Sequence, residues 1–375
     1  MQGGSVEEID RIGRYQLCFE LAVGGMATVY LARTSGVAEQ EDKLIALKRI
    51  HPALREEPGY SKMFVDEGWI GSLISHPNVC RVLDYGEEQG ELYIAMEYLV
   101  GEPLSRVFHR ILAEPGEVDR ASLTYRAAQI IADACRGLHA AHEIKGDRDE
   151  FLNIVHSDVS PHNLFVGYDG RVRIIDFGVA SAQIHSDHSS PGQVIGTFPF
   201  MAPEQMAVAR VDRRVDVWAL GVLLWELVTL RPLFEKDSDV NTMYAVLSGE
   251  IRAPSEYNDQ VPAELNEIVL RALERNPDAR FQSAEELGNA LDQFLSSREG
   301  LAGTQDVADW MAELFPQGQT QKHQLMELAK LAKSVRPPPV SIVAKSLAPF
   351  VAGLVAIALG ALAALSVMAL GWGPF

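Results

Sequence analysis

Strand-like runs dominate the first hundred residues of the chain. Each run is rich in residues that favour strands and is bounded by glycine or polar residues, so the pattern predicts β-strands, the first three in an antiparallel meander. The runs are 15–21, 28–33, 44–50, 81–85 and 92–98. Residues 60–75 have a helical period instead, which ends at His76-Pro77-Asn78.

Helical periodicity dominates the chain after residue 120. Residues 120–145 predict one helix, 154–180 return to a strand-like pattern, and 204–296 predict several helices. The uncharged run 217–225 is too short to cross a membrane and predicts a core helix. A β-rich half followed by an α-rich half predicts an α+β protein with two lobes.

Residues 297–346 form a connector of lower complexity with one ordered-looking patch. Five apolar residues in this patch have the spacing of one helix face. They are Val307, Trp310, Met311, Leu314 and Phe315. Such a face either docks on the preceding domain or binds a partner. Three prolines, 337–339, then predict a stiff, extended spacer.

A long apolar run closes the sequence. The 25 residues from Leu347 to Gly371 contain no charged side chain. As a helix they extend about 38 Å, which exceeds the bilayer hydrocarbon core of about 30 Å. The alternative is a buried core helix, but core helices seldom run this long without a polar face. We predict a transmembrane helix at 347–371 and a stub at 372–375.

Basic residues before this run predict its orientation. Lys322, Lys330, Lys333, Arg336 and Lys345 precede it, against only Glu327, and no charged side chain follows it. The positive-inside rule then places residues 1–346 in the cytoplasm and the C-terminus outside, in a single-pass protein of the inner cell membrane. Four small residues recur every four positions and allow two copies to pair; simple alanine richness is the alternative. They are Ala352, Ala356, Gly360 and Ala364.

Composition excludes several classes of protein. The chain has 51 acidic and 33 basic residues, a net charge of −18, which argues against a nucleic-acid partner. Its three cysteines are widely spaced, so they predict neither a disulfide framework nor a cysteine metal site.

Residues suited to phosphate chemistry recur in order along the chain. Leu21 to Tyr30 is a turn of small residues between two predicted strands, where backbone N–H groups can approach phosphate oxygens. Lys48 follows on a strand, and Glu67 on the next predicted helix is a candidate ion-pair partner. Farther on, the oxygen-bearing side chains of Asp158, Asn163 and Asp176 suit Mg²⁺. Each signal alone is weak, but the ordered series is specific.

Residues 14–296 resemble the catalytic domain of bacterial serine/threonine protein kinases of the eukaryotic-like (Hanks) type. The motifs are His156-Ser157-Asp158 with Asn163, Asp176-Phe177-Gly178, the segment Gly196 to Glu204, Asp216 to Gly221, and Arg280. The resemblance implies a β-rich N-lobe at about 14–96 and an α-rich C-lobe at about 97–296, after an N-terminal tail at 1–13. It also implies phosphoryl transfer from ATP to serine or threonine of protein substrates, in signal transduction and with autophosphorylation.

The resemblance assigns the site residues. Lys48 contacts the α/β-phosphates and pairs with Glu67, Asp158 accepts the proton of the substrate hydroxyl, and Asn163 and Asp176 hold Mg²⁺, with Mn²⁺ as an alternative. The remaining residues contact ATP, either over its phosphates or at the adenine hinge. They are Leu21, Ala22, Val23, Gly24, Gly25, Met26, Ala27, Thr28 and Val29 over the phosphates and Met96, Glu97 and Leu99 at the hinge.

The sequence departs from the family pattern in three places. Ala22 and Ala27 stand where the loop pattern has glycine, and because alanine resists positive φ we expect weaker nucleotide binding. Ser157 replaces the arginine that binds an activation-loop phosphate, so activation by loop phosphorylation is doubtful. Ser160 replaces a lysine that steadies the γ-phosphate, so slower turnover is expected.

Gly68 and Gly71 lie in the predicted helix that carries Glu67. Each weakens this helix by up to about 1 kcal/mol relative to alanine, from which we hypothesise a mobile helix that regulates the Lys48–Glu67 pair.

An active kinase is the favoured function. A membrane-bound pseudokinase scaffold and a small-molecule phosphotransferase of related fold are the alternatives.

Overall fold

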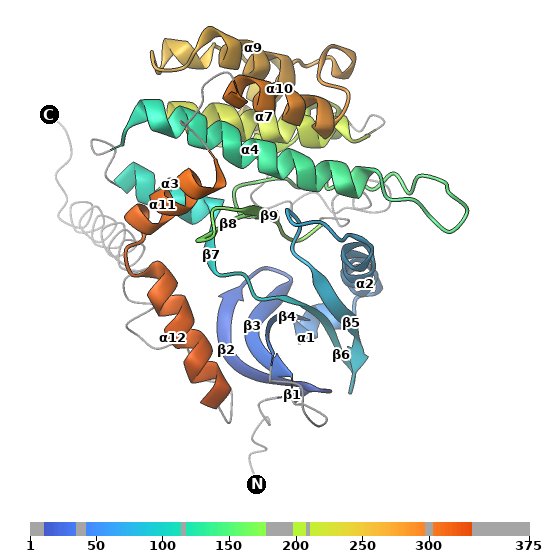
Figure 1. The fold of residues 1–375 in the computed structure, drawn as a ribbon. Coiled ribbons are helices and arrows are strands. Elements are labelled where there is room, and N and C mark those ends of the chain that lie inside the picture. Colours follow the sequence, from blue (N-terminus) through green and yellow to red (C-terminus); the bar gives the residue numbers. More distant parts are fainter. Residues whose placement is uncertain are drawn as a thin grey trace, which may run out of the picture.

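The computed structural model describes residues 11–34, 43–113, 118–177, 198–207, 211–296 and 303–331. It has two lobes, with the strands of the smaller lobe below and the helices of the larger lobe above in Figure 1. This arrangement confirms the predicted two-lobed α+β fold.

The N-lobe is a six-stranded antiparallel sheet with strand order β1-β2-β3-β4-β6-β5. Its strands are β1 (Arg11–Ile12), β2 (Tyr15–Val23), β3 (Ala27–Thr34), β4 (Leu44–Ile50), β5 (Val82–Glu88) and β6 (Glu91–Glu97). Two helices, α1 (Pro52–Arg55) and α2 (Pro58–Leu73), lie between β4 and β5 in the order of the chain. The predicted strands and the helix of Glu67 are therefore confirmed, and the pairing of Val29 with Lys48 sets the lysine beneath the β2–β3 turn.

The C-lobe is built around two long helices. They are α4 (Arg120–His142) and α7 (Arg214–Thr229), and nearly every residue of α7 is buried, as the run 217–225 predicted. A small sheet of β7 (Gly101–Pro103), β8 (Leu164–Gly167) and β9 (Val172–Ile174) faces the N-lobe. The other elements are α3 (Leu104–Ala113), η2 (Phe198–Phe200), α6 (Pro203–Met206), α8 (Asp239–Ser248), η3 (Pro254–Glu256), α9 (Ala263–Ala272), η4 (Pro277–Ala279) and α10 (Ala284–Ser296).

Two helices follow the C-lobe, α11 (Thr304–Leu314) and α12 (Gly318–Leu331). Val307, Trp310 and Met311 of α11 are buried in the core of the C-lobe, so this face docks on the preceding domain and does not serve a partner. Helix α12 was not expected in a connector of lower complexity. Only Gly318, Leu325 and Ala329 of α12 are buried, which is too few for a clear helical period.

No helix within the described ranges is long and apolar enough to cross a bilayer. The predicted span at 347–371, the stub at 372–375 and the proline spacer lie outside the described residues. The transmembrane helix therefore stays a prediction.

Candidate active site

Lys48 of the N-lobe contacts one carboxylate from each lobe. Its Nζ lies 2.6 Å from Glu67 Oε1 on α2 and 3.2 Å from Asp176 Oδ1, which follows β9. The side chains of Lys48 and Glu67 are 12% and 16% exposed, so the pair is largely removed from solvent. The structure thus brings together three of the residues that the sequence singled out.

Burial and the neighbouring charges shift the pKa values of Lys48 and Glu67. Burial lowers the pKa of Lys48, but the carboxylates of Asp176 and Glu67 outweigh burial and raise this pKa above its ordinary value, so the ammonium group stays charged. Burial raises the pKa of Glu67, Lys48 opposes this rise and Asp176 adds to it, so that the pKa lies at about 7. A permanent cation in the cleft is what a polyphosphate requires.

The small-residue turn between β2 and β3 is open to solvent above this cation. Gly24 N–H donates to Ala27 O at 2.9 Å, and His51 Nε2 lies 2.8 Å from Gly24 O. An added Cβ at Gly25 meets no atom within 4 Å. Sequence reasoning missed His51, which no motif marks and which fixes the turn from the start of α1.

The expected backbone cost of the two alanines does not arise. Ala22 is the last residue but one of β2 and Ala27 begins β3, and neither is among the residues with positive φ. The backbone argument for weaker nucleotide binding therefore does not apply at these two positions, because alanine adopts the extended conformation without cost. The strength of nucleotide binding itself stays a prediction.

A small cavity lies at the inner end of the cleft, between α2 and the sheet. Its lining includes Glu67, Cys80, Met96 and Phe177. Met96 is 9% exposed and faces this cavity from β6. Glu97 is held by Arg81, whose N–H donates to its carboxylate at 2.9 Å. Within the described residues the N–H of Leu99 has no partner, so it is available to a ring edge at the predicted hinge.

Asp158 and Asn163 form a pair in the cleft floor. Asn163 Nδ2 donates to Asp158 Oδ2 at 3.0 Å and to its carbonyl oxygen at 2.8 Å. Burial raises the pKa of Asp158, and Asp176 raises it further, against lowering by His156 and Asn163. A carboxylate oriented in this way and with a raised pKa suits a general base.

The donor set fits Mg²⁺ bound together with phosphates. Because Asn163 Nδ2 is engaged by Asp158, its Oδ1 is left for a cation, and Asp176 keeps a second oxygen beyond its contact with Lys48. Ile175 N–H donates to Asn163 O at 2.9 Å, which ties the two ligand segments together. The described residues contain no cluster of three or more His, Cys, Asp or Glu that could hold a metal. One carboxylate and one amide oxygen suit Mg²⁺ only when phosphates complete the shell.

Asp216 anchors the loop that carries Asp158. Its carboxylate is fully buried and accepts the backbone N–H groups of His156 at 2.9 Å and Ser157 at 2.8 Å. His142 Nε2 lies 2.8 Å from the same carboxylate. Burial raises the pKa of Asp216, but these hydrogen bonds and charges outweigh it, so the pKa lies below its ordinary value. His142 was not anticipated from the sequence.

The two serines that depart from the family pattern are both buried. Ser157 is 7% exposed, has φ +62°, and its Oγ has no hydrogen-bond partner. Its carbonyl accepts from Gln205 Nε2 at 3.0 Å. Ser160 is 2% exposed. Neither Ser157 nor Ser160 carries a positive charge, so neither side chain can form an ion pair with a phosphate group.

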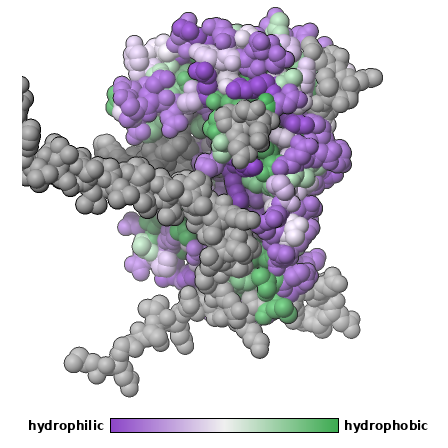
Figure 2. All heavy atoms as spheres, turned by 90° about the vertical axis from the view of Figure 1, so that its left-hand side faces the viewer, coloured by the Kyte–Doolittle hydropathy of each residue, from purple (hydrophilic) through white to green (hydrophobic). Residues whose placement is uncertain are grey.

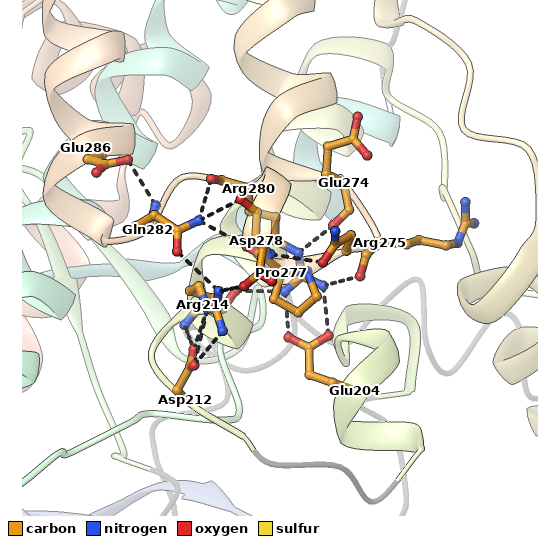
Figure 3. Close-up of polar contacts among 11 residues, drawn as sticks. Glu204, Asp212, Arg214, Glu274, Arg275, Pro277, Asp278, Arg280, Gln282 and Glu286 are labelled. Carbon is orange, nitrogen blue, oxygen red and sulfur yellow. Dashed lines mark hydrogen bonds and ion pairs between the residues drawn. The ribbon is translucent and has the colours of Figure 1, made fainter.

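Glu204 and Arg280 form a buried ion pair beneath the segment that precedes α6 (Figure 3). Arg280 Nη1 and Nη2 donate to the two carboxylate oxygens at 2.6 and 2.7 Å, and the guanidinium lies over the Trp218 ring at 5.0 Å. A bidentate pair of this kind fixes orientation as well as distance. It holds the segment from 198 to 206 against the helices of the C-lobe.

Comparisons with known proteins agree with this geometry. Residues 15–290 match the protein kinase domain family. The chain is 35% identical to the tyrosine-protein kinase MasK of Myxococcus xanthus over 332 residues, which are 88% of this chain and 50% of that protein. It is 33% identical over 280 residues to the serine/threonine-protein kinase PknB of Mycobacterium tuberculosis, covering 73% of this chain and 42% of that protein.

A solved structure also resembles the chain. The kinase domain of Mycobacterium tuberculosis PknI aligns with a TM-score of 0.54 at 25% identity, covering 76% of this chain and 96% of that domain. The chain spans half or less of the length of the curated relatives it matches. The chain belongs to the protein kinase family, among the bacterial kinases of eukaryotic-like type.

Proposed function

We propose that this chain is an active protein kinase that transfers the γ-phosphate of ATP to serine and threonine hydroxyls of proteins, itself included. The observation that carries the proposal is the assembled contact of Lys48 with both Glu67 and Asp176, 2.6 and 3.2 Å away. A cleft that has lost its chemistry has no need to keep a buried lysine between two carboxylates.

The residues divide the work of transfer. Lys48 holds the α/β-phosphates, and Asn163 and Asp176 hold Mg²⁺, which offsets the charge of the triphosphate when bound. The substrate hydroxyl attacks the γ-phosphorus while the bond to the ADP oxygen breaks, and Asp158 takes the hydroxyl proton. Asn163 keeps Asp158 turned toward the acceptor through the 3.0 Å hydrogen bond.

A radiolabelled ATP assay on the purified full chain in detergent tests the proposal. Incorporation with Mg²⁺ is expected, with Mn²⁺ as a second ion, and Asp158→Asn should reduce it by at least about 100-fold. Asp147→Asn, an exposed carboxylate in a loop of the C-lobe, is the matched control. Incorporation that survives unchanged in Asp158→Asn overturns the assignment.

The acceptor residue needs its own experiment. The relative PknB is named a serine/threonine kinase, which supports hydroxyls of serine and threonine. The name of MasK makes tyrosine the second candidate, and Ser160 gives that candidate weight because the lysine typical of serine/threonine kinases is absent. Phosphoamino acid analysis of the labelled chain decides, and phosphotyrosine alone contradicts the proposal.

A pseudokinase scaffold is the alternative that Ser157 and Ser160 favour. If the chain is such a scaffold, it binds MgATP, but its phosphate incorporation is no higher than that of the Asp158→Asn variant. A nucleotide-binding measurement alongside the transfer assay separates the two functions.

We further propose that the span at 347–371 anchors the chain in the inner cell membrane, with the kinase in the cytoplasm. The length of the apolar run and the basic residues before it support this placement. Membranes washed with alkaline carbonate should retain the full chain but release a chain that ends at residue 346. A cysteine added after Phe375 should react with an impermeant maleimide in intact spheroplasts, because Cys18, Cys80 and Cys135 are buried.

Pairing of two chains through the small residues of the span is a proposal on the same segment. Gly360→Leu, which places a large side chain in the middle of the small-residue face, should abolish cross-linked dimers of the full chain in membranes.

A further inference from the structure

The segment 303–331, which we call the C-terminal strap, contacts both lobes on the side of the predicted hinge. In Figure 1, α11 lies against the C-lobe and α12 runs down beside the strands of the N-lobe. Figure 2 looks onto this side, and its described surface is mostly hydrophilic with smaller hydrophobic patches. The strap is thus a further connection between the lobes, besides the hinge and the Lys48–Asp176 ion pair.

Helix α11 is fixed to the C-lobe. Arg126 of α4 donates to both carboxylate oxygens of Asp306 at 2.9 Å, and its guanidinium lies over the Trp310 ring. Arg110 Nε donates to Leu314 O at 3.1 Å. A bidentate ion pair with buried apolar neighbours holds this end of the strap firmly.

Helix α12 is fixed to the N-lobe. Leu325 and Ala329 are buried together with Cys18, Phe19 and Leu31 of β2 and β3. Cys18 Sγ donates to Ala329 O at 3.4 Å, and Arg33 Nη1 of β3 donates to Lys330 O at 2.6 Å. These contacts join residues about 300 positions apart in the sequence.

The start of α12 meets the residues just after the hinge. Lys322 Nζ lies 3.8 Å from Glu102 of β7, which also accepts from Tyr168 and Arg106 at 2.9 and 2.8 Å. Glu102 is 2% exposed, so this polar group is enclosed. A Cβ at Gly318 would lie 1.8 Å from the Tyr168 hydroxyl, so the first residue of α12 has to be glycine for the helix to begin this close to Tyr168.

Tyr98 connects the strap to the nucleotide cleft. Tyr98 packs against the cluster that Leu325 and Ala329 form with Cys18, Phe19 and Leu31, and its hydroxyl is buried without a hydrogen-bond partner among the described residues. Tyr98 lies in the chain between Glu97 and Leu99, two residues of the predicted adenine hinge. We therefore expect a shift of α12 against the N-lobe to displace Tyr98 and, with it, the neighbouring hinge residues.

We propose that α12 is a positioning element for ATP binding, which holds the hinge and the lobe angle through Leu325 and Tyr98. This inference rests on the proposed nucleotide function. Rotation of the N-lobe away from the C-lobe breaks contacts of the strap at one end, so the strap favours the nucleotide-binding arrangement before ATP arrives. A binding-competent state that is populated in advance raises the apparent affinity.

Two leucines of α12 offer a matched test. Leu325 is 3% exposed against the N-lobe, whereas Leu328 on the same helix is 45% exposed. In the full chain in detergent, Leu325→Ala should raise the KM for ATP and the Kd for MgATP by about fivefold or more, with kcat changed by less than about twofold. Leu328→Ala should leave all three unchanged. A merely structural role lowers the active fraction and hence kcat, and leaves KM in place.

Binding and transfer are measured separately, so this inference and the proposed function fail in different ways. If the chain binds MgATP but transfers no phosphate, the function fails and the Kd ratio of the two variants still decides on the strap. If Leu325→Ala does not fold, Arg33→Ala, which removes the hydrogen bond to Lys330 O, replaces it with the same expected direction. Equal nucleotide Kd values in the strap variant and Leu328→Ala overturn the inference.

Discussion

A methyl group added at Gly71 of α2 would lie 2.5 Å from Cγ2 of Val82 in β5, nearer than real Cβ atoms approach. Gly68, one turn earlier, would meet Tyr85 Cβ at 2.8 Å. The two glycines let α2 lie directly on β5, and this close approach accompanies the 2.6 Å contact of Glu67 with Lys48. Packing therefore explains glycines that the sequence presents only as weak points of the helix, while the mobility of α2 stays a hypothesis.

Gly71→Ala should destabilise the chain and reduce kinase activity together. Overpacking costs about 1–3 kcal/mol, which exceeds the gain of about 1 kcal/mol in helix propensity. The melting temperature should fall by a few degrees, and kcat should fall as Glu67 leaves Lys48. Gly59→Ala in the same helix, where no atom lies within 4 Å of the added Cβ, should not destabilise.

A double substitution separates packing from flexibility. With Val82→Ala in place, the added methyl group of Gly71→Ala has room, so the second substitution should cost less than it does in the parent chain. Strictly additive melting temperatures speak against the contact as the cause.

Glu67→Gln tests the ion pair without changing the shape of the side chain. The amide removes the negative charge that orients Lys48, so kcat should fall by about 100-fold, in line with the cost of a misplaced group near the chemistry. Steady-state kinetics with a protein acceptor measures this fall. Asp66→Asn, on the neighbouring surface position where the carboxylate pairs only with Lys62, is the control and should change kcat little.

Phosphorylation of the activation loop should have little effect on the rate. Because Ser157 is buried and carries no charge, a loop phosphate gains no ion pair beside Asp158. Replacing the serines at 181, 186, 189 and 190 by alanine should leave kcat within about twofold of the parent chain. Phosphatase treatment, checked by mass spectrometry, should agree; a tenfold loss in either experiment contradicts the prediction.

Local patterns predicted the parts of the fold that depend on neighbours in sequence. The strands of the N-lobe are runs of strand-forming residues bounded by glycine or polar residues, and the motif spacings around Asp158 and Asp176 follow from short strands and turns. The ion pair of Lys48 with Glu67 was likewise predictable, because strand β4 and helix α2 are close in sequence.

Features that depend on distant surfaces were not predictable in the same way. Helix α12 is polar, and the burial of Leu325 and Ala329 follows from β2 and β3, about 300 residues earlier. The argument that Ala22 weakens nucleotide binding by resisting positive φ does not apply, because the family pattern does not reveal the backbone angle, which is extended here. His51 and His142 gain their roles only from folded neighbours.

Glu226 of α7 should make the stability of the chain depend on pH. The residue is 9% exposed, and its carboxylate accepts a hydrogen bond from Leu233 N–H at 2.9 Å. Burial raises its pKa to about 7, the Leu233 hydrogen bond opposes this, and Glu235 adds to it. Between about pH 5 and 7 the folded chain keeps a proton that the unfolded chain has lost, so stability falls as pH rises through this window.

Glu226→Gln removes this dependence, because glutamine keeps the acceptor for Leu233 but never ionises. At pH 8 the variant should be more stable than the parent chain by up to about 3 kcal/mol, and at pH 5 the two should be nearly equal. Urea unfolding at both pH values measures the difference. Glu267→Gln, an exposed glutamate of α9, should show no such change between pH 5 and 8. A stability difference for Glu226→Gln that is the same at both pH values would show that Glu226 is already ionised in the folded chain at pH 5.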